Sequence, residues 1–191
     1  MGLPHAEARF DMETYLVWEA TQTEKHEYHR GEVFAMVGAR LPHQQVSGNA
    51  AMALRQQLRG TAYRVYMSGT KLHIAAADAV LYPDVIVSCD ARDRGSEDRF
   101  LAFPALVVEV LSESTAAYDR GAKFALYRTL ETLREYLIVD PDSRRVELFR
   151  RGADGHWVLH DFTDAAHVDF ASIDVSVAVA ELFEDLDKPQ T

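Results

Sequence analysis

Hydrophobic and polar residues follow one another along the chain in patterns that predict helices and short strands. The clearest helix is expected from Pro42 to Arg59, where apolar residues recur about once per helical turn and Gly60 follows the last turn. Shorter helices are expected over 10–20, 118–130 and 178–186. Apolar runs bounded by glycine, proline or charged residues predict strands over 31–38, 63–67, 71–75, 82–88, 104–111 and 135–139.

The part of the chain after residue 140 predicts a β-hairpin. Strand-like segments over 145–150 and 157–161 flank a glycine-containing turn over 152–155. A charged loop is expected over 90–99. The pattern contains no internal repeat, linker or low-complexity segment, so it predicts a single domain over 1–191 of the α/β (α+β) class.

Composition and charge narrow the class of protein. The 191 residues carry a formal net charge of −10, which excludes a strongly basic protein that coats nucleic acid, so any nucleic-acid contact would be local. The single cysteine, Cys89, excludes an internal disulfide, and we expect it to be a small buried residue. Because no apolar run could span a membrane and the first residues do not resemble a signal peptide, we expect a cytoplasmic protein without membrane contact.

Two acidic residues stand in apolar runs. Asp84 precedes the run VIV, and Glu109 interrupts VVEVL in the middle of an expected strand. A buried carboxylate needs a partner, a metal ion or a cleft, and a single one is most simply paired with an arginine or a loop. Two of them on consecutive expected strands favour a shared site.

The helix expected after the Glu109 strand adds a polar stripe. Asp119, Lys123 and Tyr127 are spaced i, i+4 and i+8, so they share one face of that helix. From there Lys123 could reach the carboxylate of Glu109. The simpler alternatives are a weak surface ion pair for Asp119 and Lys123, and core packing for Tyr127.

The strings YPDVIV, PALVVEVLSESTAAYDRGAKFALYR and REYLIVDP, in this order, resemble the Uma-two family of restriction endonucleases within the PD-(D/E)xK nuclease superfamily. The start EKHEYHRGEVFAM, followed by His43 and Asn49, resembles the N-terminal block of that family. The resemblance runs from about residue 24 to residue 151. It implies a restriction-endonuclease-like core, in which a central mixed β-sheet is flanked by helices and the predicted C-terminal β-hairpin is added.

The resemblance also implies roles for individual residues. Asp84 matches the aspartate of the PD element and Glu109 the acid of the (D/E)xK element, whereas the position of the motif lysine holds Leu111. Lys123 would replace that lysine from the following helix. Glu27 matches an extra acid that many such nucleases supply from an early helix.

The same resemblance implies a divalent cation and a reaction. Oxygen ligands suit Mg²⁺ or Mn²⁺, so Asp84, Glu109 and the backbone carbonyl of Val110 are the expected ligands. Glu27 would complete the shell or hold a metal-bound water, and Lys123 would orient the attacking water or stabilise the developing negative charge. The expected activity is that of a Mg²⁺-dependent endonuclease acting on DNA. The alternative is a catalytically inactive nuclease fold that binds nucleic acid or protein.

The sequence also suggests supporting residues for the site, a homodimer and local positive charge. His43 could support the site, although a polar residue at a helix start is a common alternative. Asp119 and Tyr127 are the other candidate supporting residues. We expect a homodimer, since the hairpin offers strand edges to a partner. Local positive charge is expected from arginines in the C-terminal half, namely Arg120, Arg128, Arg144, Arg145, Arg150 and Arg151.

Overall fold

The computed structural model describes residues 10–36, 38–67, 69–95 and 100–186. Its centre is a six-stranded sheet in the order β10-β9-β8-β7-β6-β3. Strands β7 and β8 are parallel, and the other neighbours are antiparallel. The strands are β3 (Arg64–Met67), β6 (Val85–Ser88), β7 (Leu106–Val110), β8 (Glu135–Asp140), β9 (Arg145–Arg151) and β10 (Trp157–Asp161). The expected mixed central sheet is confirmed.

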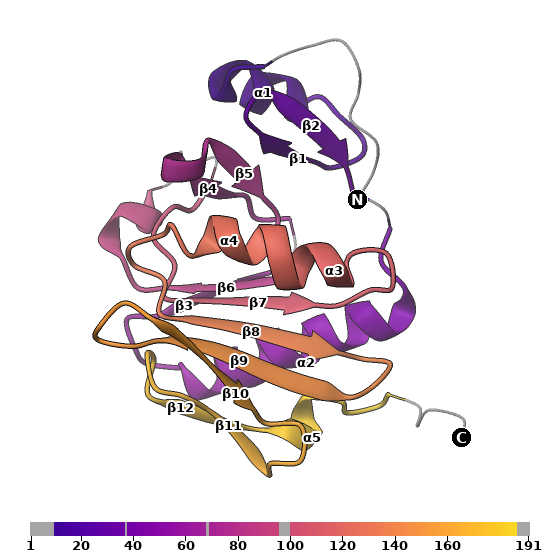
Figure 1. Cartoon of the computed structure of the whole chain (residues 1–191), viewed down its shortest axis with the longest axis vertical. Helices are drawn as coiled ribbons and strands as arrows, with labels where there is room; N and C mark the ends of the chain where they lie inside the picture. The colour runs from indigo at the N-terminus through magenta and orange to yellow at the C-terminus, as the bar shows by residue number, and fades with distance from the viewer. Residues whose placement is uncertain (1–9, 37, 68, 96–99, 187–191) are drawn as a thin grey trace.

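Helices cover both faces of this sheet (Figure 1). Helix α2 (Leu41–Gln57) packs on one face, against alternate strand residues such as Val85, Val108 and Leu137. The segment formed by α3 (Ala116–Tyr118), η3 (Asp119–Lys123) and α4 (Phe124–Tyr127) packs on the other face, against Ile86, Val107 and Tyr136. Successive side chains along a strand point to opposite faces of the sheet, so they enter two separate cores in alternation.

A second, antiparallel sheet lies beside the first, in the order β2-β1-β5-β4. Its strands are β1 (His26–His29), β2 (Glu32–Ala35), β4 (Leu72–Ile74) and β5 (Ala79–Leu81), with the 3-10 turn η1 (Ala75–Ala77) between the last two. Helix α1 (Met12–Glu19) begins after Asp11, whose carboxylate accepts a hydrogen bond from the Thr14 amide at 2.7 Å. Tyr15 and Leu16 of α1 pack against Tyr28 and Val33 of the sheet.

The connection between the two sheets corrects one expectation. The segment 82–88 was expected to be a single strand, but only 85–88 is β6, and the preceding strand β5 belongs to the other sheet. Residues 82–84 form the corner between them. Proline at the middle of this corner lacks a backbone N–H, so it could not extend either ladder. Asp84 therefore stands at the entrance to β6 rather than within a strand.

The C-terminal part holds more structure than expected. The expected hairpin is confirmed as β9 and β10, which pair in register from Trp157↔Arg151 to Asp161↔Glu147. A second hairpin, β11 (His167–Phe170) and β12 (Val175–Ala178), follows it and leads into the short helix α5 (Val179–Leu182). These elements pack against the face of the sheet that carries α2.

Three smaller expectations need correction or fall partly outside the described residues. Strand β1 was not expected, since its residues precede the segment 31–38 that was expected to form a strand. Cys89 is exposed, not buried, because it directly follows the last residue of β6 and leaves the sheet. The expected loop 90–99 contains the 3-10 turn η2 (Ala91–Arg94), whereas residue 37 of the expected strand 31–38 and residues 96–99 lie outside the described residues.

No helix within the described ranges has the length and apolar character that crossing a membrane would require. The prediction of one domain over 1–191 stays a prediction.

Candidate active site

Asp84, which directly precedes β6, lies next to Glu109 of the neighbouring strand β7. Val85 of β6 pairs with Val108 of β7 in an antiparallel register, which puts Asp84 and Glu109 at adjoining positions on the face under α3–α4. The carboxylate of Asp84 accepts a hydrogen bond from the backbone N–H of Val110 at 2.8 Å. Both side chains are buried, with Glu109 only 3% exposed. The structure thus brings together the two acids that the sequence singled out.

Lys123 lies at the centre of the acidic cluster. Its Nζ atom is 2.8 Å from Oε1 of Glu109, 3.2 Å from Oε1 of Glu27 and 3.7 Å from Oδ1 of Asp119. Its side chain is buried, so the interpretation of Asp119 and Lys123 as an exposed surface pair is wrong. One ammonium group therefore contacts acids from β1, β7 and its own helix.

The helix that carries Lys123 is not a regular α-helix. The expected helix over 118–130 spans 116–127, and its middle turn, η3, has π-helical hydrogen bonding. A π turn holds an extra residue and widens the helix locally, a feature often found at functional sites. Asp119 and Lys123 are both buried within this turn, facing the sheet.

Glu27 reaches the cluster from a strand. The family resemblance implied an acid from an early helix, but Glu27 lies in β1, between the buried residues His26 and Tyr28. Its Oε1 atom accepts a hydrogen bond from the backbone N–H of Tyr82 at 3.2 Å. The hydroxyl of Tyr82 donates in turn to Glu19 at 2.7 Å. Sequence reasoning missed Tyr82 and Glu19, and only the position of Tyr82 beside Pro83 and Asp84 could have suggested a role.

Two tyrosines support the acids from the sheet side of the helix. The hydroxyl of Tyr127 donates a hydrogen bond to Oε1 of Glu109 at 2.6 Å, and both groups are buried. The hydroxyl of Tyr136 on β8 donates to the backbone carbonyl of Asp119 at 3.1 Å. Tyr127 was a candidate from its helical spacing, whereas Tyr136 was missed because it belongs to an otherwise apolar strand. Leu111, at the place of the motif lysine, is buried in the apolar core beneath the same helix.

His43 approaches Asp84 from the first turn of α2. Its Nε2 atom lies 3.2 Å from Oδ2 of Asp84, while no described residue hydrogen-bonds to its buried Nδ1 atom. Asn49, two turns further along α2, donates instead to the backbone carbonyls of Leu182 and Glu184. Asn49 therefore ties α2 to the C-terminal helix and is not part of this site.

Burial and mutual repulsion shift the ionisation of the cluster. Burial raises the pKa of Glu109 well above its usual range, and the charges of Asp119 and Asp84 add to this while Lys123 opposes it. Burial likewise raises the pKa of Asp119. Burial alone would lower the pKa of Lys123, but the three neighbouring carboxylates outweigh it and raise this pKa well above its usual range.

The pKa of His43 is raised for a similar reason. Burial opposes the charged imidazolium, but the hydrogen bond to Asp84 and the charge of that carboxylate outweigh burial. The cluster thus contains four carboxylates, from Glu27, Asp84, Glu109 and Asp119, against the cations of Lys123 and, when protonated, His43. The carboxylates of the cluster therefore outnumber its cations.

The donor set fits a hard divalent cation in type and in charge. The described residues contain no group of three or more histidine, cysteine, aspartate or glutamate side chains placed to hold a metal ion. Mg²⁺, however, commonly binds only one or two protein carboxylates and completes its shell with water and phosphate oxygens. Asp84 and Glu109 offer two such carboxylates, and a cation there would offset the excess negative charge.

The arginines of the C-terminal half do not form a free basic patch. Arg120 and Arg145 both pair with Glu147, and Arg150 pairs with the buried Glu135 at 2.7 Å. The remaining ones are also engaged, since Arg144 donates to the carbonyl of Leu186, Arg151 to those of Leu130 and Glu131, and Arg128 lies over the ring of Phe124. Among the described residues, carboxylates therefore neutralise Arg120, Arg145 and Arg150, whereas Arg128, Arg144 and Arg151 contact neutral groups and keep their charge.

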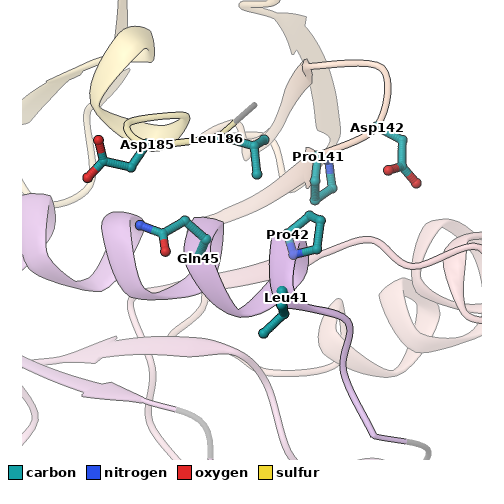
Figure 2. A pocket seen from close by; sticks show the side chains of 7 residues that line it. All are labelled: Leu41, Pro42, Gln45, Pro141, Asp142, Asp185 and Leu186. Carbon is teal, nitrogen blue, oxygen red and sulfur yellow. The ribbon is translucent and has the colours of Figure 1, made fainter. Parts of the chain in front are cut away.

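A cavity of about 280 Å³ at the start of α2 is separate from the acidic cluster. In Figure 2, Pro42 and Gln45 of α2 lie opposite Pro141 and Leu186. Its wall includes the acids Asp142 and Asp185 and none of the candidate site residues.

Comparisons with known proteins show the family and the fold of this chain. The sequence model described as "Uma2: Putative restriction endonuclease" matches residues 12–180. The chain belongs to the Uma2 family. The "Uncharacterized protein slr1290" of Synechocystis sp. is 38% identical to this Uma2 protein over 174 residues, which cover 91% of each chain. Another Synechocystis protein, sll1609, is 32% identical over 159 residues, or 82% of this chain and 90% of the relative.

A solved structure shares the fold of this Uma2 protein. It is a protein of Anabaena variabilis described as "a putative nuclease belonging to DUF820", with a TM-score of 0.74 and 15% sequence identity. The match covers 91% of this chain and 97% of that chain. The restriction-endonuclease family and the nuclease-like fold expected from the sequence are therefore both confirmed.

Proposed function

We propose that this Uma2 protein is a metal-dependent endonuclease that hydrolyses phosphodiester bonds in DNA. The observation that carries the proposal is the contact between Lys123 and Glu109, with Asp84 on the adjoining strand. A cation and two carboxylates of adjacent strands, all buried, are expensive to assemble for structure alone, because apolar residues would fill the same space more stably. Such clusters are typical of active sites.

Asp84 and Glu109 would hold the Mg²⁺ or Mn²⁺ ion, and the carbonyl of Val110 is a further candidate ligand. The ion would lower the pKa of water and offset negative charge on the phosphate when it is bound. Tyr127 holds the carboxylate of Glu109 in place through its 2.6 Å hydrogen bond. His43, in the first turn of α2, does the same for Asp84.

Lys123 is suited to act on the attacking water or on a phosphate oxygen. An ammonium group has three N–H donors, and two of them are directed to Glu109 and Glu27. The distance to Asp119, 3.7 Å, is longer than a hydrogen bond. One N–H is therefore left to donate to the substrate, while Glu27 would accept a hydrogen bond from the attacking water.

We also propose that two copies act together on duplex DNA. Strand β10 forms one edge of the central sheet, and its residues Val158 and Leu159 are about half exposed. An edge strand with apolar side chains is suited to pair with the same strand of a second copy.

Cleavage of plasmid and linear DNA in Mg²⁺ or Mn²⁺ tests the function directly. We expect the wild-type protein to cleave DNA and EDTA to stop the reaction. The cleavage rate of Asp84→Asn and of Lys123→Gln should be lower by about 100-fold or more. Asp142→Asn is the matched control, because Asp142 is an exposed acid that pairs with Arg40 and with none of the clustered residues.

Calorimetric titration of Mn²⁺ separates the proposal from the alternative of an inactive binding module. Saturable binding that is lost in Asp84→Asn but kept in Asp142→Asn is the expected result. No cleavage in any metal, together with identical titrations of wild type and Asp84→Asn, would refute the nuclease proposal and favour the binding module.

A further inference from the structure

A second cavity, of about 380 Å³, is lined in part by Lys71, whose Nζ atom lies over the ring of Tyr82. It is formed by the end of β3, the turn before β4 and the turn η2, and its lining includes Tyr66, Thr70, Arg94 and Phe100. Its volume lies within the range of about 300–1,000 Å³ that is usual for small-molecule sites.

Tyr82 connects this cavity to the proposed active site. Its backbone N–H donates to Glu27 of the acidic cluster, while two lysine ammonium groups lie over its ring. The Nζ atoms of Lys25 and Lys71 are 5.7 and 5.5 Å from the centre of that ring. Lys71 itself lines the cavity. Lys25 borders it through Gly69, where an added Cβ would lie only 3.1 Å from the lysine Nζ.

The cavity carries positive charge that the fold does not neutralise. Among the described residues, neither Lys25 nor Lys71 has a carboxylate within ion-pair distance, and Arg94 donates only to the carbonyls of Ala62 and Cys89. Asp93, the one acid among the described lining residues, is buried and already accepts hydrogen bonds from Ser88, Ala102 and Phe103. In a chain with a net charge of −10, this group of cations beside an acidic site is suited to an anionic ligand.

The lining combines these cations with aromatic rings. Tyr66 and Phe100 both border the cavity, and Phe100 is held by an edge contact with His73 at 4.8 Å between ring centres. Lysines that bind phosphate and aromatic rings that stack on bases are the usual means of binding single-stranded nucleic acid. A base paired within a duplex would not be available to such rings without unstacking.

We propose that this cavity binds one unpaired nucleotide of the DNA strand beside the bond that the acidic cluster cleaves. Lys25 and Lys71 bind its phosphate, and Tyr66 and Phe100 contact its base. This inference rests on the proposed nuclease function and adds to it a preference for substrates with a single-stranded segment.

Binding of a fluorescent oligothymidylate, measured by anisotropy in EDTA at several salt concentrations, tests the site without cleavage. We expect the single strand to bind more tightly than a blunt duplex of the same length. Lys25→Gln and Lys71→Gln should each reduce the slope of log affinity against log salt by about 0.7, and Phe100→Leu should weaken binding about tenfold. Arg55→Gln, which removes an exposed charge on α2 at the opposite face of the sheet, should leave the slope unchanged.

The outcomes separate this inference from the nuclease proposal. If the wild type binds the duplex as tightly as the single strand, binds neither, or shows the same salt slope as both lysine variants, the nucleotide site is refuted. Wild-type cleavage of DNA in Mg²⁺ together with any of these results would leave the nuclease proposal standing. The expected binding pattern without cleavage in any metal would support the nucleotide site and refute the nuclease proposal. Circular dichroism and melting of the variants, which change exposed or cavity-lining residues, show whether each is folded.

Discussion

The ammonium group of Lys123 lies 2.8 Å from the carboxylate of Glu109, although the two residues belong to different elements. In the PD-(D/E)xK motif the lysine follows the acid by two positions on the same strand, and here that position holds the buried Leu111. The π turn of the following helix supplies the cation instead. A lysine thus contacts the acid, but it belongs to the following helix and not to the same strand.

Replacing Glu109 by glutamine should remove activity and stabilise the folded protein. Burial raises the pKa of Glu109, so the folded state keeps its proton to higher pH than the unfolded chain does. Wild-type stability should therefore fall as pH rises above 4.5, the ordinary pKa, towards the raised value. Glu109→Gln lacks this fall in stability. We therefore expect the variant to be more stable than wild type by about 1–2 kcal/mol at about pH 8, and its advantage over wild type to be smaller at about pH 5.

Urea unfolding at both pH values measures this difference. Glu135→Gln serves as the control, because Glu135 is also buried and accepts hydrogen bonds from Arg150 and Ser172, whereas Glu109 shares the cation of Lys123 with two other carboxylates. That variant should lose stability, since it leaves those donors without a charged acceptor. A Glu109→Gln protein that is less stable than wild type at both pH values would contradict the prediction.

Removing the hydroxyl of Tyr127 should move the activity to higher pH. That hydroxyl donates to Glu109 at 2.6 Å and so favours the ionised carboxylate. In Tyr127→Phe the pKa of Glu109 should rise further, and the acidic limb of the pH–rate profile should move up by about one unit, as a hydrogen bond to a charged group predicts. Tyr63→Phe, whose hydroxyl binds the carbonyl of Ser172 on the other face of the sheet, should leave the profile unchanged. An unshifted limb in Tyr127→Phe would show that Glu109 does not control it.

The sequence predicted those helices and strands whose buried residues form a regular apolar pattern. The strands of the central sheet alternate between two cores, so their apolar runs were visible and their order along the chain was correct. Strand β1 was missed because buried polar residues make up half of it, with His26 and Glu27 satisfied by tertiary contacts. No local pattern reveals such contacts.

The candidate site was predictable to a similar extent. Asp84 and Glu109 stood out because acids are rare within apolar runs, and Lys123 followed from helical spacing. The π turn was hidden, since Asp119 and Lys123 have the same separation in sequence whether the turn is α or π. Tyr136 and Tyr82 join the site through hydrogen bonds that only the folded chain creates. The pairing of arginines with Glu147 and Glu135 was hidden for the same reason.

A substitution in the π turn should stabilise the protein. Gly121 has no neighbouring atom within 4 Å of the place where a Cβ would lie, and its backbone is helical. Gly121→Ala should therefore raise stability by about 0.5–1 kcal/mol, or Tm by about 2 °C, and keep activity. Gly155 also has free space but a φ of +84°, so Gly155→Ala should lower Tm. A decrease for Gly121→Ala would mean that the π turn needs the freedom of glycine.

A charge on the edge strand should separate the proposed dimer. Leu159 is half exposed on β10, and a lysine there would oppose pairing with a second copy. Light scattering after gel filtration should show a dimer for wild type and a monomer for Leu159→Lys. Met52→Lys, at an even more exposed apolar residue of α2, should remain a dimer. A monomeric wild type would exclude pairing through β10.

Exchanging the residues at positions 111 and 123 tests whether the cation of Lys123 replaces that of the motif lysine. Leu111 follows Glu109 by two positions and belongs to the core beneath the same helix, so a lysine there would start from the same face of the sheet. Lys123→Leu should lose activity by about 100-fold or more. The double variant Lys123→Leu with Leu111→Lys keeps the overall composition. Its initial rate of plasmid cleavage should be at least tenfold higher than that of Lys123→Leu.

Leu111→Lys alone controls for the effect of a second cation. A folded double variant that is no more active than Lys123→Leu would show that the site needs the ammonium from the helix, in contact with Glu27 and Asp119 as well as Glu109.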